Sequence, residues 1–113
     1  MKAIVYNEYS PEDDFAKILK VQEVDDPKPK SDEVVFQVKA AALNYNDIWG
    51  MRGNPVPVPL PHVSGSDAAG DVIAVGEDVK NIQVGDRVVS HSNMSCRVCK
   101  ACTDGREFDC TKR

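Results

Sequence analysis

Four cysteines near the C-terminal end carry the clearest chemical signal in this 113-residue sequence. They follow a C-x2-C-x2-C-x7-C pattern, as Cys96, Cys99, Cys102 and Cys110. Two-residue gaps allow one chain segment to surround a zinc ion, with each sulfur about 2.3 Å from the metal. Four protein ligands leave no open coordination position. The pattern therefore predicts a structural rather than catalytic Zn²⁺, held in a lobe over residues 94–113.

Disulfide bonds and an iron–sulfur cluster are the alternative uses of four cysteines. Disulfides rarely persist in a reducing cytosol, and residues 1–8 turn polar too soon for a secretory signal. Charge supports zinc, because residues 96–113 carry five basic and three acidic side chains. The resulting charge of +2 would balance the −2 of one Zn²⁺ with four thiolates.

The composition of the chain is that of an ordinary globular domain, with 42% hydrophobic and 28% charged residues. A formal charge of −4 gives no reason to expect nucleic acid or an anionic membrane as partner. No apolar stretch approaches the 18 or so residues that a membrane span needs. We therefore expect a cytoplasmic protein without nucleic-acid or membrane partners.

Short strands separated by turn signals dominate the pattern, which predicts a mainly β fold with the character of a partly open barrel. The clearest strand covers 34–40, where Val34, Phe36, Val38 and Ala40 share one face. A short helical turn over 46–51 should end at Gly53, and alternate prolines over 55–61 indicate a stiff extended loop. The other expected strands cover residues 2–6, 18–24, 70–75 and 86–90.

Two glycine-containing motifs, over 65–76 and 84–88, closely resemble the signature of the medium-chain dehydrogenase/reductase superfamily. That signature lies in a GroES-like catalytic domain, and the cysteine lobe follows at the place where many of these enzymes bind structural zinc. The resemblance implies that residues 1–113 form an incomplete GroES-like domain. An α/β Rossmann domain is expected after residue 113, because the chain has no G-x-G-x-x-G motif. The resemblance also implies a homodimer or homotetramer.

Two departures from the superfamily bear on its chemistry. Zinc alcohol dehydrogenases hold a catalytic metal with an early cysteine and a Gly-His-Glu motif, whereas this sequence has Asn44 and Gly65-Ser66-Asp67 at those positions. Asparagine and serine are poor zinc ligands beside thiolate and imidazole. His62, four residues before Ser66, is interpreted as a loop histidine. The comparison implies that the catalytic zinc is absent and ordinary alcohol dehydrogenation is disfavoured.

Superfamily members without that metal reduce activated C=C bonds. The segments 44–49, 62–70 and 85–93 are similar to crotonyl-CoA carboxylase/reductase and its non-carboxylating enoyl-CoA reductase relatives. The resemblance implies NADPH-dependent reduction of an α,β-unsaturated acyl-CoA, with or without carboxylation, although the carboxylases usually lack the cysteine lobe. A quinone or enone reductase, a relative of zinc-dependent alcohol dehydrogenases and a non-enzymatic zinc-binding module are the alternatives. The 113 residues alone should be inactive.

The segment that follows the clearest strand should open the active-site cleft. Asn44 and Asn46 can donate and accept hydrogen bonds, and Tyr45 offers a phenol. Asn44 and Tyr45 are also the candidates for contact with NADPH, while Trp49 could pack against nicotinamide or the acyl chain. The simpler alternative is a capped turn with a buried Trp49. His91, at a strand end, completes the catalytic candidates.

Overall fold

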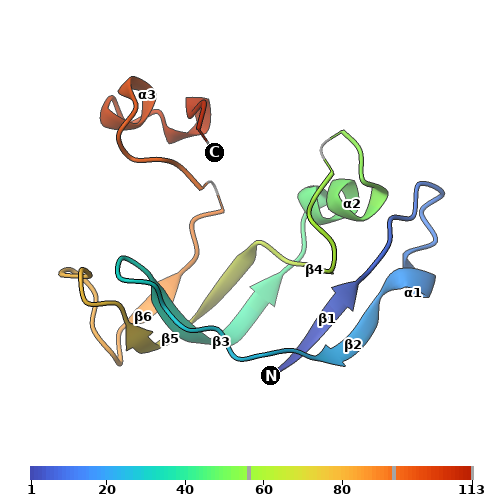
Figure 1. The fold of residues 1–113 in the computed structure, drawn as a ribbon, viewed down its shortest axis with the longest axis horizontal. Helices are drawn as coiled ribbons and strands as arrows, with labels where there is room; N and C mark the ends of the chain where they lie inside the picture. Colours follow the sequence, from blue (N-terminus) through green and yellow to red (C-terminus); the bar gives the residue numbers. More distant parts are fainter. Residues whose placement is uncertain (56, 93, 113) are drawn as a thin grey trace.

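Two open three-stranded antiparallel sheets form the framework of the fold in the computed structural model, which describes residues 1–55, 57–92 and 94–112 (Figure 1). Val56, Asn93 and Arg113, which belong to the expected proline loop, the 85–93 motif and the lobe, lie outside the described residues. The predicted mainly β architecture is confirmed, with no closed barrel in the described part of the chain. The elements are β1 (Lys2–Tyr6), α1 (Phe15–Ile18), β2 (Lys20–Glu23), β3 (Val34–Ala42), α2 (Tyr45–Arg52), β4 (His62–Val63), β5 (Asp67–Val75), β6 (Arg87–Val89), α3 (Lys100–Thr103) and a 3₁₀ helix, η1 (Glu107–Asp109).

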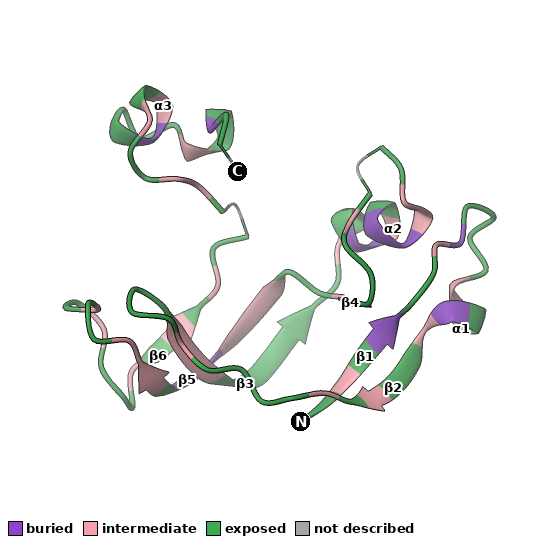
Figure 2. Ribbon diagram, viewed as in Figure 1, coloured by how far each residue is buried: buried purple, intermediate pink, exposed green. Residues whose placement is uncertain are grey.

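The first sheet has the strand order β2-β1-β4 and carries the main hydrophobic core. Tyr6 at the end of β1 packs with Ile18 of α1 and Met51 of α2, and all three side chains are at most 5% exposed. Figure 2 shows buried residues on β1, α1 and α2, the three elements that meet in this core. Both helices are therefore held by apolar contact with this sheet.

The strand expected over 18–24 is shorter than predicted. Ile18 ends helix α1, and β2 covers only Lys20–Glu23. Alternation of side chains could not reveal this helix, because its four residues are too few for a helical period to show. Burial of Ile18 against Tyr6 and Met51 favours the helical turn.

The second sheet has the order β3-β5-β6, and its long β3–β5 pair contains two shifts in register. They fall between Val35 and Phe36 and between Val38 and Ala40. Such bulges break the two-residue alternation of a strand. The prediction that Val38 shares a face with Val34 and Phe36 is therefore wrong. Val34 and Phe36 are half-buried, whereas Val38 is 55% exposed.

Close approach of β3 and β5 explains one of the motif glycines. A Cβ on Gly70 would lie 2.0 Å from the carbonyl oxygen of Gln37, so no larger residue fits without moving the strand. Gly53 has a different role, because it ends α2 with a φ of 68° in the left-handed region. The predicted end of the helical turn at Gly53 is confirmed.

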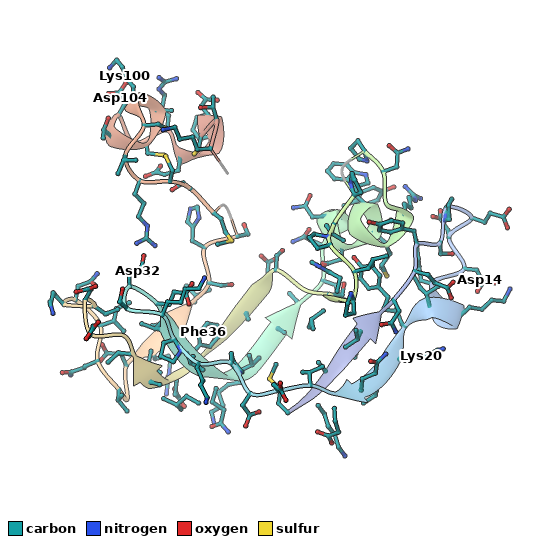
Figure 3. The ribbon with its side chains drawn as sticks, in the orientation of Figure 1. Asp14, Lys20, Asp32, Phe36, Lys100 and Asp104 are labelled. Carbon is teal, nitrogen blue, oxygen red and sulfur yellow. The ribbon has the colours of Figure 1, made fainter. Side chains whose placement is uncertain are left out.

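Beyond β6 the chain leaves the sheet and forms a separate small lobe that contains α3 and η1 (Figure 1). Figure 3 shows Lys100 and Asp104 together on this lobe, where their charged atoms are 2.9 Å apart. None of the helices in the described ranges has the length and apolar character needed to cross a bilayer.

Candidate functional site

The four cysteines meet in the lobe, as their spacing predicts. Their sulfur atoms all lie within 4.8 Å of one another, and Cys102 and Cys110 are buried. The Sγ of Cys102 is 3.4 Å from that of Cys99 and 3.9 Å from that of Cys96. Sulfurs placed tetrahedrally about 2.3 Å from a zinc ion would be about 3.8 Å apart. The cluster therefore has the donor set and dimensions of a four-thiolate zinc site.

Backbone N–H groups donate hydrogen bonds to the sulfurs of this cluster and so favour cation binding. The N–H of Cys99 donates to the Sγ of Cys96, and the N–H groups of Cys96 and Lys112 donate to the Sγ of Cys110. Hydrogen bonds from the backbone of Val98 and Cys99 lower the pKa of Cys96 to about 6. Such bonds favour the thiolate, which is the form that binds metal.

The pKa of Cys102 is shifted in the opposite direction. Burial, followed by contact with the thiol of Cys99, raises the pKa of Cys102 to about 11. Two thiolates side by side in a dry site repel each other, so one sulfur keeps its proton until a cation replaces it. Two of the basic side chains of the lobe form ion pairs with carboxylates, Lys100 with Asp104 and Arg106 with Asp109.

A second polar cluster joins the start of α2 to the start of β5. Asn44 is the N-cap of α2, and its Oδ1 accepts the N–H of Asn46 at 2.8 Å. The Nδ2 of Asn44 donates to Asp67 Oδ2 at 2.8 Å and lies 3.4 Å from Ser66 Oγ. The structure thus brings together Asn44, Ser66 and Asp67, the three positions that the sequence comparison linked to catalytic zinc. Both polar atoms of the Asn44 side chain, Oδ1 and Nδ2, therefore have hydrogen-bond partners.

Asp47 forms further hydrogen bonds in the same region. Its buried carboxylate accepts the N–H of Asn44 at 2.8 Å and the N–H of Gly65 at 2.7 Å, and Ser64 Oγ is 3.3 Å away. The contact with Asn44 forms a capping box, which the N-x-x-D spacing indicates. The contact with Gly65 ties α2 to the connection between β4 and β5, and no local pattern predicts it.

Tyr45 and Trp49 form an exposed aromatic pair on α2. Their ring centroids are 5.5 Å apart, at an interplanar angle of 80°, and the side chains are 59% and 44% exposed. The capped turn of the simpler alternative is therefore confirmed, whereas its buried Trp49 is wrong. Arg52 lies over Tyr45, 5.9 Å from its ring centroid, and both nitrogens of its fork donate to Asp13 at 2.5 Å. The pair leaves aromatic surface exposed on α2, where a ligand can contact it.

A cavity of about 250 Å³ lies beside this cluster. Of the predicted residues only Asn46 lines it, whereas His91 lines a separate hollow of about 890 Å³ next to β6. His62 does line the smaller cavity, and it lies in β4 opposite Tyr6 rather than in a loop. Sequence reasoning missed Tyr6 and set His62 aside, because their pairing depends on strands far apart in the chain. The lining residues are Tyr6, Asn46, Asp47, Gly50, Val58, His62, Ser64, Gly65, Ser66 and Ser92.

Two curated relatives are similar to most of this chain. An acryloyl-coenzyme A reductase of Sulfurisphaera tokodaii is 37% identical over 94 residues, which is 83% of this chain and 28% of that protein. A crotonyl-CoA carboxylase/reductase of Cereibacter sphaeroides is 41% identical over 98 residues, which is 81% of this chain and 21% of that protein.

Two solved structures share the fold. An NAD-dependent alcohol dehydrogenase superposes with a TM-score of 0.88 at 38% identity, covering 99% of this chain and 32% of that one. The Escherichia coli quinone oxidoreductase complexed with NADPH gives 0.69 at 32% identity, covering 79% of this chain and 26% of that one. The chain spans less than a third of the length of each of these four proteins. Residues 30–113 match the family model for the alcohol dehydrogenase GroES-like domain, so this chain belongs to that family, within the medium-chain dehydrogenase/reductases.

Proposed function

We propose that this chain is part of a medium-chain oxidoreductase that reduces the C=C bond of an α,β-unsaturated acyl-CoA, with NADPH as reductant. Similarity to an acryloyl-coenzyme A reductase and to a crotonyl-CoA carboxylase/reductase supports an acyl-CoA substrate. The observation that carries the proposal is the orientation of the Asn44 amide beside Ser66 and Asp67.

That orientation follows from elementary hydrogen bonding. The N–H of Asn46 can only donate, so Asn44 must present its oxygen to the helix and its NH₂ group to Ser66 and Asp67. A metal ion at this position would meet amide hydrogens on one side. The residues present therefore do not fit a catalytic zinc, and a reaction that needs no Lewis acid suits the site better.

Reduction of an enoyl thioester meets that requirement, because the thioester carbonyl already withdraws electrons from the C=C bond. NADPH, when bound, supplies a hydride to the β-carbon. The π electrons of the C=C bond then move toward the carbonyl, whose oxygen gains charge as an enolate. A proton taken up at the α-carbon restores the carbonyl and completes the reduction, and a carboxylating enzyme would add CO₂ there instead.

The residues of this chain would bind and orient the reactants. Tyr45 and Trp49 present an exposed aromatic surface on α2 that suits nicotinamide or a short acyl chain. Asn46 and Ser66 line the adjacent cavity and can hydrogen-bond a carbonyl oxygen. We assign the cysteine cluster to a structural zinc with no open coordination position. We also propose a cytosolic location, where acyl-CoA and NADPH are available.

Substrate comparison with the purified full protein tests the proposal. NADPH consumption should be faster with crotonyl-CoA than with a quinone, and mass spectrometry of the product with and without bicarbonate reports on carboxylation. Trp49→Ala should raise KM, whereas the matched control Val21→Ala, which removes an exposed side chain on β2, should not. Zinc-dependent alcohol oxidation, or zinc binding without any reductase activity, would contradict the proposal.

A quinone reductase is the second candidate. It is favoured by the structural similarity to the quinone oxidoreductase complexed with NADPH. NADPH consumption with quinone alone would select it.

A further inference from the structure

The hydroxyl group of Tyr6 has no hydrogen-bond partner among the residues that the structure describes. The Tyr6 side chain is only 1% exposed, and its ring belongs to the core with Ile18 and Met51. No fully buried side-chain nitrogen or oxygen among the described residues lacks a partner, so the Tyr6 oxygen reaches solvent-accessible space. A phenol that reaches such space without a protein partner can donate its hydrogen bond to a ligand.

Tyr6 lines the 250 Å³ cavity beside α2, and its hydroxyl lies next to Gly50 in the same wall. Tyr6 and Gly50 both line it, and a Cβ on Gly50 would lie 2.9 Å from the Tyr6 oxygen. Exposed residues such as Asn46, Ser66 and Ser92 surround the opening, whereas buried Tyr6 and Gly50 lie at its inner end. The absence of a side chain at Gly50 leaves the space in front of the hydroxyl.

The size and polarity of the cavity limit what can occupy it. Its volume is below the roughly 300–1,000 Å³ of sites for drug-sized ligands, so it suits a carbonyl with a short chain rather than a whole CoA. Phenol, amide and hydroxyl groups in its wall are all able to donate. Among the described residues no Lys or Arg lines it, and the carboxylate of Asp47 does, so a neutral acceptor fits better than a phosphate or carboxylate.

We propose that the Tyr6 hydroxyl donates a hydrogen bond to the carbonyl oxygen of the substrate in this cavity, as a catalytic residue of the reduction. The inference rests on the proposed function, which places an electron-withdrawing carbonyl beside the reacting C=C bond. A donor already in position strengthens its bond as the oxygen gains charge, which lowers the barrier to hydride addition. The Tyr6 hydroxyl thereby stabilises the charge on the carbonyl oxygen, as a Lewis acid would.

Two features keep Tyr6 suited to this task. Its strand pairs it with His62, whose ring lies 5.4 Å away at an angle of 53° and restricts how the phenol can turn. Burial raises the pKa of Tyr6. The phenol therefore stays protonated, and able to donate, at neutral pH.

Tyr6→Phe, studied in the full protein, removes only the hydroxyl. We expect a fall in kcat of up to about 100-fold, as for the loss of one oxyanion donor, with no decrease in the urea midpoint because no protein hydrogen bond is lost. Tyr9→Phe is the matched control, since the Tyr9 hydroxyl donates to the Val58 carbonyl at 2.6 Å. It should lower the urea midpoint and leave kcat unchanged. Gly50→Ala should place a methyl against the Tyr6 hydroxyl and lower kcat while the phenol is still present.

A pair of ligands separates the carbonyl contact from other effects. Wild-type protein should bind butyryl-CoA more tightly than S-butyl-CoA, a thioether that lacks the carbonyl, and Tyr6→Phe should remove that preference. An unchanged preference, or an unchanged kcat, would overturn the inference while the proposed function stands. If the wild type reduces a quinone instead, the proposed function fails, and Tyr6→Phe still decides the inference because quinones carry carbonyl oxygens too. Wild-type protein that neither turns over nor distinguishes these compounds would refute both.

Discussion

The amide nitrogen of Asn44 lies 2.8 Å from a carboxylate oxygen of Asp67, 23 residues further along the chain. The same side chain uses its oxygen to cap helix α2. One asparagine therefore fastens the helix that carries Tyr45 and Trp49 to the first residue of β5. The Nδ2 group of Asn44 must face Asp67, because the Oδ1 atom of Asn44 already accepts the N–H of Asn46.

Asn44→Asp should test this dual role. Aspartate caps a helix as well as asparagine does, but it would place a second carboxylate against Asp67. Like charges in contact raise the pKa of one carboxyl, so the folded state binds more protons than the unfolded state and stability falls as pH rises. We expect the variant to be about 1–2 kcal/mol less stable than wild type at pH 7 and to recover toward pH 3. Urea unfolding across this range measures the effect.

Asn44→Ser is the matched control, since serine also caps but adds no charge. Its stability relative to wild type should depend on pH much less than that of Asn44→Asp. A pH-independent loss in Asn44→Asp would show that the two carboxylates do not interact.

The metal content of the protein should be one zinc per chain. The cysteine cluster supplies one complete ligand set, whereas Asn44 and Ser66 do not supply another. Cys102→Ser should lose the zinc and unfold the lobe, because structural zinc binding is coupled to folding. Val98→Ala, a 75% exposed residue of the same lobe, should retain it. Elemental analysis giving two tightly bound metals per chain would contradict the prediction.

Zinc uptake should also release fewer than four protons per ion at pH 7. The pKa of Cys96 is lowered to about 6, so this thiol is already ionised at pH 7, whereas Cys102, with a pKa raised to about 11, must lose its proton. Titration calorimetry in buffers of different ionisation enthalpy counts the protons. Lowering the pH below 6 should increase the number released.

Asp47→Asn should destabilise the fold by about 2–3 kcal/mol, because hydrogen bonds to a buried charged group are strong. The amide keeps one oxygen but places an NH₂ group against either the Asn44 or the Gly65 N–H. Asp14→Asn offers a matched control, since Asp14 pairs with Lys17 at the surface and should change stability by less than about 1 kcal/mol. Equal losses in the two variants would argue against a special role for Asp47.

Asp13 should contribute to stability in a pH-dependent way. Hydrogen bonds from Arg52 hold the pKa of Asp13 below its ordinary value of 3.8. A carboxyl with a lowered pKa stabilises the fold above its unfolded pKa, and the contribution disappears as pH falls through the folded pKa. The difference in urea midpoint between wild type and Asp13→Asn should therefore be constant from pH 7 to 5 and shrink below about 3.8. Asparagine tolerates the positive φ of 63° at this position, so backbone strain does not confuse the comparison.

The sequence alone determined the features that depend on near neighbours. The spacing of Cys96, Cys99 and Cys102 places three sulfurs within seven consecutive residues, so the cluster in the lobe could be predicted without knowing the fold. The cap at Asn44 and the helix end at Gly53 are equally local, since each depends on residues within four positions. The mainly β class followed from short strands between turn signals.

Only the tertiary structure decided which distant residues share a site. The pairing of Tyr6 with His62 and the contact of Asp13 with Arg52 depend on how β1, β4 and α2 come together. The helical turn at Ile18 and the exposed side of β3 likewise reflect core burial and bulges rather than alternation. The physical reason is that hydrophobic burial depends on the apolar area removed from water over the whole chain. A sequence pattern reports only the preferences of neighbouring residues.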